Sequence, residues 1–570
     1  MTKVPTSPSS ADDDDGVAAT GMASRLVPSE KTRMTGYEAG LPSAGGDRGA
    51  AGTLATARAW RTESAQRWSL ALWIVLSLQT AAALCTTDDL PFYDYYQWLY
   101  QGHVVSVLLF GADGGAGAGS FALSPVPVPN LAAPIVIGVL NTVLPIEAAG
   151  TVFVILTTLG FAVAFGHLVR TVQQRPTAVE FLGFPWAMGF FLYKGYLSYT
   201  VGVAVMFVLV AHLDRSVRQS TPLHRANLAM VTGLGLLLYM SHLLAWLMGG
   251  VAVLLYAVVL GRRGRRHAAL RLILCMCPGV VLAGWYVLAE HGGTGITLYP
   301  SWPDKAIALT ETFQFFLRLD PFPPTFPLLW VNAALAAAFA ALVLIPLDRR
   351  GCREAIRTRP VLWLSAALAV VAVGLPVSMV NDLIKPDERF VAPALLLAVA
   401  ALPYRPTRLG VTALGAAFAA VVVAAHGVEY IDVGRRIARV DAAIDAVVPD
   451  QARVLHLTVP ARYGCTASTG PVTGVPVLKW FAVDHALEGG PAGVNVEETS
   501  LVHTRDPGEL GTTVLALDSA DVPAVLPTAS AYQYVEAIAC GSDLDRIGRA
   551  LAPAYRLVSR GASYAIFQRR

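Results

Sequence analysis

The chain alternates between long apolar runs and short polar segments that are often rich in arginine. The apolar runs cover residues 68–85, 131–147, 149–169, 178–193, 196–213, 226–260, 268–289, 326–347, 361–380, 390–404 and 409–426. Most are near the roughly 17 to 25 residues that cross a bilayer as a helix. The run at 226–260 is long enough for two crossings, and we expect it to fold back near Ser241 and His242. The pattern predicts an α-helical polytopic membrane protein whose membrane domain covers residues 67–426.

Composition agrees with this class. Hydrophobic residues make up 54% of the 570 residues, charged residues only 15%, and the mean hydropathy is +0.52. An ordinary soluble domain has about 25% charged residues. The net charge of +3 is small, and the arginine clusters fall in short loops between apolar runs, as topology signals do. No nucleic-acid partner is therefore expected.

The charges also predict how the chain is threaded. Residues 1–66 are polar, lack apolar periodicity and include four consecutive acids, so we expect a disordered cytoplasmic tail. Arginine-rich loops at 261–267, 348–359 and 405–408 also belong in the cytoplasm. We therefore expect the loops 290–325 and 381–388, and everything after 427, on the outer side of the membrane. We expect a bacterial-type cytoplasmic (inner) membrane protein with an extracytoplasmic C-terminal domain.

The number of crossings follows from parity. Counting the run at 226–260 twice gives twelve candidate segments, but ends on opposite sides of the membrane need an odd number. The segment 131–147 is short and holds Pro134 and Pro145, so we expect it to be re-entrant or interfacial. About eleven transmembrane helices are therefore predicted.

Beyond residue 427 the apolar runs give way to alternating short helices and strands. A helix is expected near 434–447, strands at 453–457, 513–517 and 532–538, a helix at 543–551 and a closing strand pair within 554–568. This alternation predicts an α/β domain over 427–570. Cys465 and Cys540 are the two cysteines of this domain, and we predict a disulfide between them in an oxidising compartment.

Two adjacent acids, Asp88 and Asp89, follow the first apolar run after only two threonines. Charge beside hydrocarbon is costly, so the pair is a candidate functional site, although it could simply solvate the end of a helix. An aromatic, amphipathic segment at 92–103 comes next and is expected to lie at the membrane interface. Sugars bind by stacking on tyrosine and tryptophan, and a partly desolvated carboxylate suits a base acting on an acceptor hydroxyl.

Several short stretches resemble the GT-C superfamily of integral membrane glycosyltransferases that depend on polyprenyl-phosphate sugars. They are Asp88-Asp89-Leu90-Pro91-Phe92 with Gly102-His103, the segment from Lys194 to Tyr199, Ser241-His242, and the segment from Asp387 to Pro393. The resemblance also covers the order of parts: a cytoplasmic tail, one helix, an acid pair, a juxtamembrane helix, many helices and an external domain. It implies inverting transfer of a hexosyl or pentosyl group from a polyprenyl-phosphate donor.

The resemblance also suggests roles for individual residues. Asp88 or Asp89 would be the catalytic base, and Arg389 would hold the donor phosphate, with Lys385 as a second candidate. His242 and Lys194 would line the donor pocket. Relatives often have histidine where Tyr93 or Asp94 stands, which makes Asp94 a third candidate for the base or a metal ligand.

Simpler interpretations of the same residues are a headgroup anchor for Arg389, a hydrogen-bonded helix-turn histidine for His242, and interfacial snorkelling for Lys194.

The sequence leaves the cofactor unknown, because outer-side acids are numerous enough for a divalent metal but form no recognisable ligand set. The expected partners are a polyprenyl-phosphate-linked sugar, membrane lipid, and a glycan, lipid or protein acceptor. The alternative is a non-catalytic membrane scaffold or a transporter whose external domain binds a partner. Transporters commonly show repeated halves with broken helices. The sequence shows no such internal repetition.

Overall fold

The computed structural model describes most of the helical region and part of the C-terminal region. The described residues are 48–87, 90–111, 121–218, 224–289, 301–320, 325–376, 378–379, 383–384, 386–405, 409–449, 452–458, 474–476, 502–504, 514–516, 529–539 and 541–570. Asp88, Asp89, Lys385, Cys465 and Cys540 lie outside these residues, and so does most of the predicted tail.

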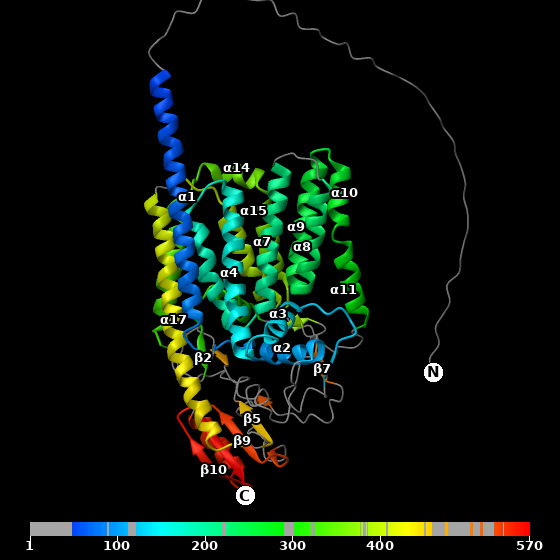
Figure 1. Cartoon of the computed structure of the whole chain (residues 1–570), viewed down its shortest axis with the longest axis vertical. Helices are drawn as coiled ribbons and strands as arrows, with labels where there is room; N and C mark the ends of the chain where they lie inside the picture. The colour runs from blue at the N-terminus through cyan, green and yellow to red at the C-terminus, as the bar shows by residue number, and fades with distance from the viewer. Residues whose placement is uncertain are drawn as a thin grey trace, which may run out of the picture. The chain divides into compact units, whose positions relative to one another are not determined.

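Long apolar helices dominate residues 61–570, which form one unit (Figure 1). Six helical stretches in the described part of the chain are long and apolar enough to cross a membrane. They are Gln66–Leu84 within α1 (Arg48–Leu84), α4 (Ile146–Gln173), α7 (Leu197–Arg218), α9 (Leu243–Arg262), Arg266–Ala289, which contains α10 (Arg266–Leu274) and α11 (Cys277–Ala289), and Gly410–Asp445 within α17 (Leu409–Asp445). A seventh results if α14 (Gly351–Thr358) and α15 (Pro360–Gly374), bent by 79°, count as one span. These helices suggest a membrane protein.

The predicted count of about eleven spans is not confirmed. Several apolar runs form helices shorter than a typical span of about 20 residues. Residues 131–147 contain only α3 (Ala132–Asn141) and the first residues of α4, and α8 (Arg225–Ser241), α13 (Leu328–Leu344) and α16 (Pro386–Ala401) are also short. The run at 178–193 is broken into η2 (Ala178–Leu182), α5 (Gly183–Met188) and α6 (Phe190–Tyr193), and all sixteen of its residues are buried. An apolar run can therefore belong to the protein core as well as to a lipid-facing span.

The break predicted near Ser241 and His242 is confirmed. α8 ends at Ser241, His242 is extended with φ −169° and ψ 133°, and α9 begins at Leu243. The two helices fold back on each other and pack closely: a methyl group on Gly249 of α9 would lie 2.5 Å from Leu238 Cδ1 of α8. Close approach of this kind is typical of small residues at helix contacts in membranes.

The aromatic segment predicted at the interface forms α2 (Tyr95–Phe110), which lies across one end of the long helices (Figure 1). Its aromatic side chains do not form an exposed girdle, however. Tyr95, Tyr96 and Tyr100 are buried, and Tyr95 packs edge-on against Phe92 with ring centres 6.1 Å apart. These rings pack into the protein core, and the position of the segment at the membrane interface stays a prediction.

The C-terminal region forms the predicted α/β structure. Its five-stranded sheet has the order β10-β11-β9-β5-β8, with β5 parallel to β8 and β9, and β11 antiparallel to β9 and β10. The elements are β5 (Val454–Thr458), β8 (Val514–Ala516), β9 (Tyr534–Ile538), α20 (Gly541–Leu551), β10 (Tyr555–Arg560) and β11 (Tyr564–Arg569). They match the predicted strands and helix closely. The predicted helix at 434–447 is the continuation of α17, so the expected boundary at 427 falls inside one continuous helix.

Three observations connect the sheet region to the helices. The end of α17 shares a buried core with the sheet, through residues such as Ile444, Val454 and Ile538. Two short pairings link distant segments: β1 (Phe121–Leu123) with β7 (Val502–Thr504), and β2 (Arg318–Asp320) with β6 (Gly474–Pro476).

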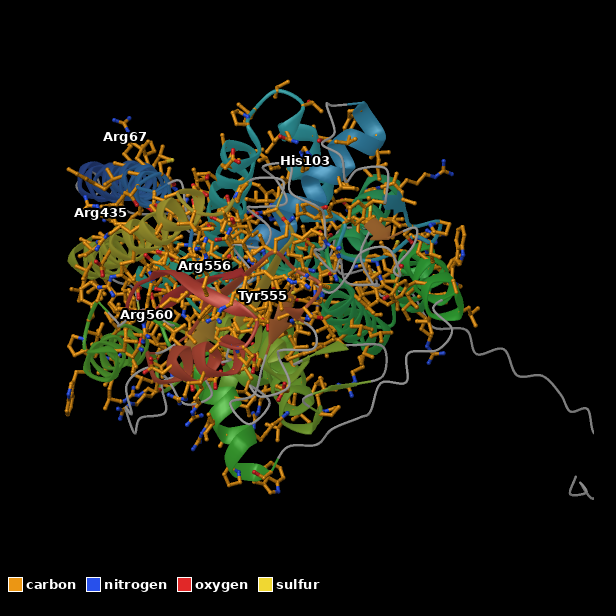
Figure 2. The ribbon with its side chains drawn as sticks, turned by 90° about the horizontal axis from the view of Figure 1, so that it is seen from below. Arg67, His103, Arg435, Tyr555, Arg556 and Arg560 are labelled. Atoms are coloured by element: carbon orange, nitrogen blue, oxygen red, sulfur yellow. The ribbon has the colours of Figure 1, made fainter. Side chains whose placement is uncertain are left out.

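The remaining described elements are α12 (Trp302–Glu311) and the pair β3 (Ser378–Met379) and β4 (Leu383–Ile384). Figure 2 shows α1, with Arg67, beside α17, with Arg435.

Candidate functional site

The residues that flank the acid pair pack against α17. Thr87 lies so close to this helix that a methyl group on Gly434 would be 2.2 Å from Thr87 Oγ1. On the other side of the pair, the ring of Phe92 meets that of Tyr430 edge-on, with centres 5.3 Å apart. The chain therefore runs along α17 on both sides of the pair, although the two carboxylates themselves lie outside the described residues.

Asp94, the third candidate base, is half-buried and directly precedes α2. Its backbone lies against Gly195, whose φ of +69° is in the left-handed region that favours glycine. A methyl group on Gly195 would be 2.4 Å from the Asp94 nitrogen. Two hydrogen bonds hold these segments together: Tyr93 N–H donates to the Tyr193 carbonyl at 3.0 Å, and Trp98 Nε1–H donates to the Gly195 carbonyl at 2.8 Å.

Arg389 and His242, separated by 147 residues in the sequence, come together beside two tyrosines. Arg389 Nη1 is 3.4 Å from His242 Nε2. The guanidinium carbon lies 4.3 Å from the ring centre of Tyr196 and 5.9 Å from that of Tyr199. The Tyr199 hydroxyl donates to the Arg389 carbonyl, and the Tyr199 and His242 rings meet edge-on at 5.1 Å. We call Arg389, His242, Tyr196 and Tyr199 the cationic cluster.

The hydrogen-bond chemistry of the cationic cluster leaves two donors facing each other. His242 Nδ1 accepts the backbone N–H of Leu244 at 3.1 Å, so the hydrogen of a neutral His242 ring belongs on Nε2. A guanidinium has donors only. Arg389 Nη1 and His242 Nε2 therefore cannot satisfy each other, and Arg389 Nε is also buried without a hydrogen-bond partner among the described residues. An oxyanion placed between them would accept from both.

Asp387, two residues before Arg389, is committed to a partner of its own. Asp387 is fully buried and pairs with Lys305, with 2.6 Å between the carboxylate oxygen and Nζ. Lys305 also donates to the Leu375 carbonyl at 2.5 Å. A buried pair of this kind is costly to break, because the remaining charge would lose its partner. The Lys305–Asp387 pair therefore fixes the start of α16, on which Arg389 lies.

Lys194, a further predicted ligand, is half-buried with its Nζ 5.6 Å from the ring centre of Phe190. It lies in the segment 193–196, between Tyr193 and the Tyr196 of the cationic cluster. The structure thus brings Arg389 and His242 into contact and places Asp94 and Lys194 on segments packed beside them. The roles predicted for these residues stay predictions.

A second polar cluster, which the sequence analysis missed, forms at Tyr193, the other end of the segment 193–196. The Tyr193 hydroxyl donates to the Glu429 carboxylate and lies 3.2 Å from His426 Nδ1. The His426 ring stacks on Phe316, with centres 4.1 Å apart. We call Tyr193, His426, Glu429 and Tyr430 the buried cluster, since none is more than 2% exposed. The i, i+3, i+4 spacing of His426, Glu429 and Tyr430 was its sequence signal.

Among the described residues, no group of three or more histidine, cysteine or acidic side chains is arranged to hold a metal ion. Cys85, Cys275, Cys277 and Cys352 are free thiols. The predicted disulfide involves residues outside the described part of the chain.

The fold is mostly helical with a small C-terminal sheet region, and its long apolar helices suggest that the class is a membrane protein. No protein-family model matches the chain, and no curated protein is significantly similar to it.

Proposed function

We propose that this protein is a membrane glycosyltransferase that takes a sugar from a polyprenyl-phosphate donor and binds the donor phosphate between Arg389 and His242. The observation that carries the proposal is the pair of N–H donors, 3.4 Å apart, that cannot hydrogen-bond to each other. A phosphate oxygen is a suitable acceptor for both, and hydrogen bonds to an ionised group are about twice as strong as neutral ones.

The tyrosines of the cationic cluster support this role. The guanidinium is planar and stacks over Tyr196, so its orientation is set before a ligand arrives. The hydroxyl of Tyr199 fixes the backbone of Arg389 from the other side. Arg389 also lies in the first turn of α16, where the backbone amides add partial positive charge.

The proposed reaction needs a base near this phosphate. A carboxylate of Asp88, Asp89 or Asp94 removes the proton of the acceptor hydroxyl, whose oxygen then attacks the anomeric carbon of the sugar. The bond from that carbon to the donor phosphate oxygen breaks, and the polyprenyl phosphate leaves as an anion beside Arg389. The packing of Asp94 on Gly195, next to Tyr196, supports a base at this end of the helices. The acceptor is a glycan, lipid or protein on the outer side of the membrane.

The first test measures donor binding without any acceptor. The full chain in lipid nanodiscs would be titrated with polyprenyl phosphate and with a polyprenyl-phosphate hexose, and the bound fraction read by native mass spectrometry. We expect Arg389→Gln to weaken binding about tenfold to hundredfold, the range for hydrogen bonds to a charged group. Arg389→Lys keeps the charge but loses the forked arrangement of N–H donors, so its donor affinity should lie between those of the wild type and Arg389→Gln.

A matched control is Arg556→Gln, which removes the same charge from an exposed position on β10 (Figure 2). It should bind like the wild type. Equal binding by Arg389→Gln and wild type, at unchanged thermal stability, would remove Arg389 from the phosphate site.

The second test separates an enzyme from a scaffold or transporter. Transfer from a radiolabelled polyprenyl-phosphate sugar would be followed in membranes that contain the wild type or single Asp→Asn variants at 88, 89 and 94. We expect the variant at the base to lose transfer while it still binds the donor. Donor binding by the wild type without transfer to membrane acceptors would favour a scaffold, and full activity in all three variants would exclude these acids as the base.

A further inference from the structure

A cavity of about 560 Å³ lies between the middle of α1 and the C-terminal ends of α4 and α7. Four arginines line it: Arg170, Arg175, Arg215 and Arg218. Gln66, Ser69, Leu70, Thr171, Gln174 and Pro176 complete the lining. We call this cavity the arginine pocket.

The arginine pocket is distinct from the cationic cluster. α7 begins at Leu197, beside Tyr196, and ends at Arg218 in the arginine pocket. A helix of 22 residues is about 33 Å long at about 1.5 Å per residue. The two arginine sites are thus at opposite ends of one helix, and substitutions in one leave the other untouched.

Two of the four arginines are held by acids and backbone carbonyls. Arg170 makes a forked pair with Glu180, at 2.9 and 3.1 Å, and also donates to Ser69 at 2.8 Å. Arg218 pairs with Asp214 and donates to the carbonyls of Thr171, at 2.6 Å, and Val172, at 3.2 Å. These contacts hold Arg170 and Arg218 in the wall of the arginine pocket, and they use the charges of both Glu180 and Asp214.

The other two arginines contribute uncompensated charge. Within the described part of the chain, neither Arg175 nor Arg215 forms an ion pair. Arg175 donates to the Tyr404 carbonyl, and its Nε is buried with no hydrogen-bond partner among the described residues. Arg215 is exposed. Two of the four guanidinium groups are paired with acids, so among the described side chains the cavity retains about two positive charges and one buried donor, Arg175 Nε, without a partner.

We propose that the arginine pocket binds a phosphate group. Guanidinium groups match the paired oxygens of phosphate through forked hydrogen bonds, and two arginines without an acidic partner among the described residues suit a phosphate mono- or diester. The source of the phosphate is either a phospholipid headgroup or a soluble phosphorylated molecule. Leu70, which lines the pocket, is 59% exposed, and Ile74 follows one turn later at 52%. This apolar stripe on α1 is positioned to contact the acyl chains of a lipid.

The test uses the full chain in detergent, titrated separately with phosphatidylglycerol, with phosphatidylcholine and with inorganic phosphate or glycerol 3-phosphate. Bound lipid would be counted by native mass spectrometry, and phosphate binding by calorimetry. The informative variants are Arg175→Gln and Arg215→Gln. The matched control is Arg266→Gln, an exposed arginine outside the pocket lining. Arg266 lies near the same end of α7 as the pocket, since neighbouring Arg263 donates to the Val217 carbonyl at 2.9 Å.

We expect each pocket variant to bind about fivefold more weakly than wild type, as for one basic residue at an anionic surface. Arg266→Gln should bind like wild type. If the wild type retains phosphatidylglycerol and the pocket variants lose it, the ligand is a lipid headgroup. Loss confined to inorganic phosphate or glycerol 3-phosphate would identify a soluble ligand. Equal binding of every probe by wild type and both variants would overturn the proposal. Thermal unfolding of each variant would show whether lost binding is lost fold.

Discussion

The buried cluster and the cationic cluster include the first and the last residue of the four-residue segment 193–196, yet their chemistry differs. In the buried cluster, the donor of Tyr193 meets the acceptor of Glu429, and both side chains are shut off from solvent. In the cationic cluster, the donors of Arg389 and His242 face each other with no acceptor between them among the described residues, and Arg389 is only half-buried.

This difference separates a structural role from a binding role. A matched, sealed pair holds elements together, because a buried carboxylate without its donor would be costly. A cluster whose donors find no acceptor in the described part of the chain can gain one from a ligand. We therefore expect changes in the buried cluster to lower stability, and changes in the cationic cluster to lower ligand binding. Each prediction below could break that division.

The largest effect is expected from Gly195→Ala, because this position supports both clusters. An alanine at φ +69° costs about 1–2 kcal/mol, and its methyl group would be 2.4 Å from the Asp94 nitrogen. Overpacking against backbone adds about 1–3 kcal/mol. We expect a loss of about 2–5 kcal/mol in stability, seen as a lower thermal unfolding temperature in detergent, together with weaker donor binding.

Gly250→Ala is the matched control for this substitution. Gly250 lies within α9 and has open space where a methyl group would be added, so alanine should be neutral or slightly stabilising. If Gly195→Ala unfolded at the wild-type temperature, the segment 193–196 would not be the rigid support of the two clusters.

The next effect is expected from Tyr193→Phe, which removes the donor from the Glu429 carboxylate. An unsatisfied buried acceptor costs about 1–3 kcal/mol, so thermal stability should fall by that amount while polyprenyl phosphate still binds. Adding Glu429→Gln closes a double-mutant cycle that measures the coupling of the pair.

Tyr564→Phe on β11 serves as the control for Tyr193→Phe, since the Tyr564 hydroxyl has no hydrogen bond within the described residues. The opposite pattern, with Tyr193→Phe losing donor binding at unchanged stability, would assign the buried cluster to ligand binding as well.

Local patterns in the sequence predicted several elements correctly. The helix break at His242 follows from an apolar run too long for one crossing, and β5 and β9 follow from compact apolar stretches between turn residues. Strand and helix periods are local properties, so one sequence carries them.

The sequence could not predict which apolar surfaces face protein. The run at 178–193 has the composition of a membrane span, but all of it is buried in the protein. The tyrosines of α2, expected at the membrane interface, are buried as well. The composition of an apolar segment does not show whether lipid tails or the leucines of a neighbouring helix surround it, because both are equally apolar.

The candidate site was only partly predictable for a related reason. Arg389 and His242 were both identified from their sequence, but the contact between them spans 147 residues and depends on the packing of α7, α9 and α16. The buried cluster was missed because His426 and Glu429 fall on either side of the domain boundary expected at 427. That boundary hid the single helix face that they share within α17.

The smallest effect is expected at His242, which takes part in two interactions that can be separated. Its Nδ1 caps α9 by accepting the Leu244 N–H, and its Nε2 faces Arg389. His242→Ala loses both, so we expect a loss of about 1 kcal/mol in stability, as for other removed helix caps, and weaker binding of polyprenyl phosphate. His242→Asn restores a cap acceptor, but its shorter side chain does not carry an N–H group as far as the position of His242 Nε2. It should unfold at nearly the wild-type temperature and still bind the donor more weakly. Wild-type binding by His242→Asn would show that Arg389 alone recognises the phosphate, and the cationic cluster would then have one ligand-binding donor group in place of two.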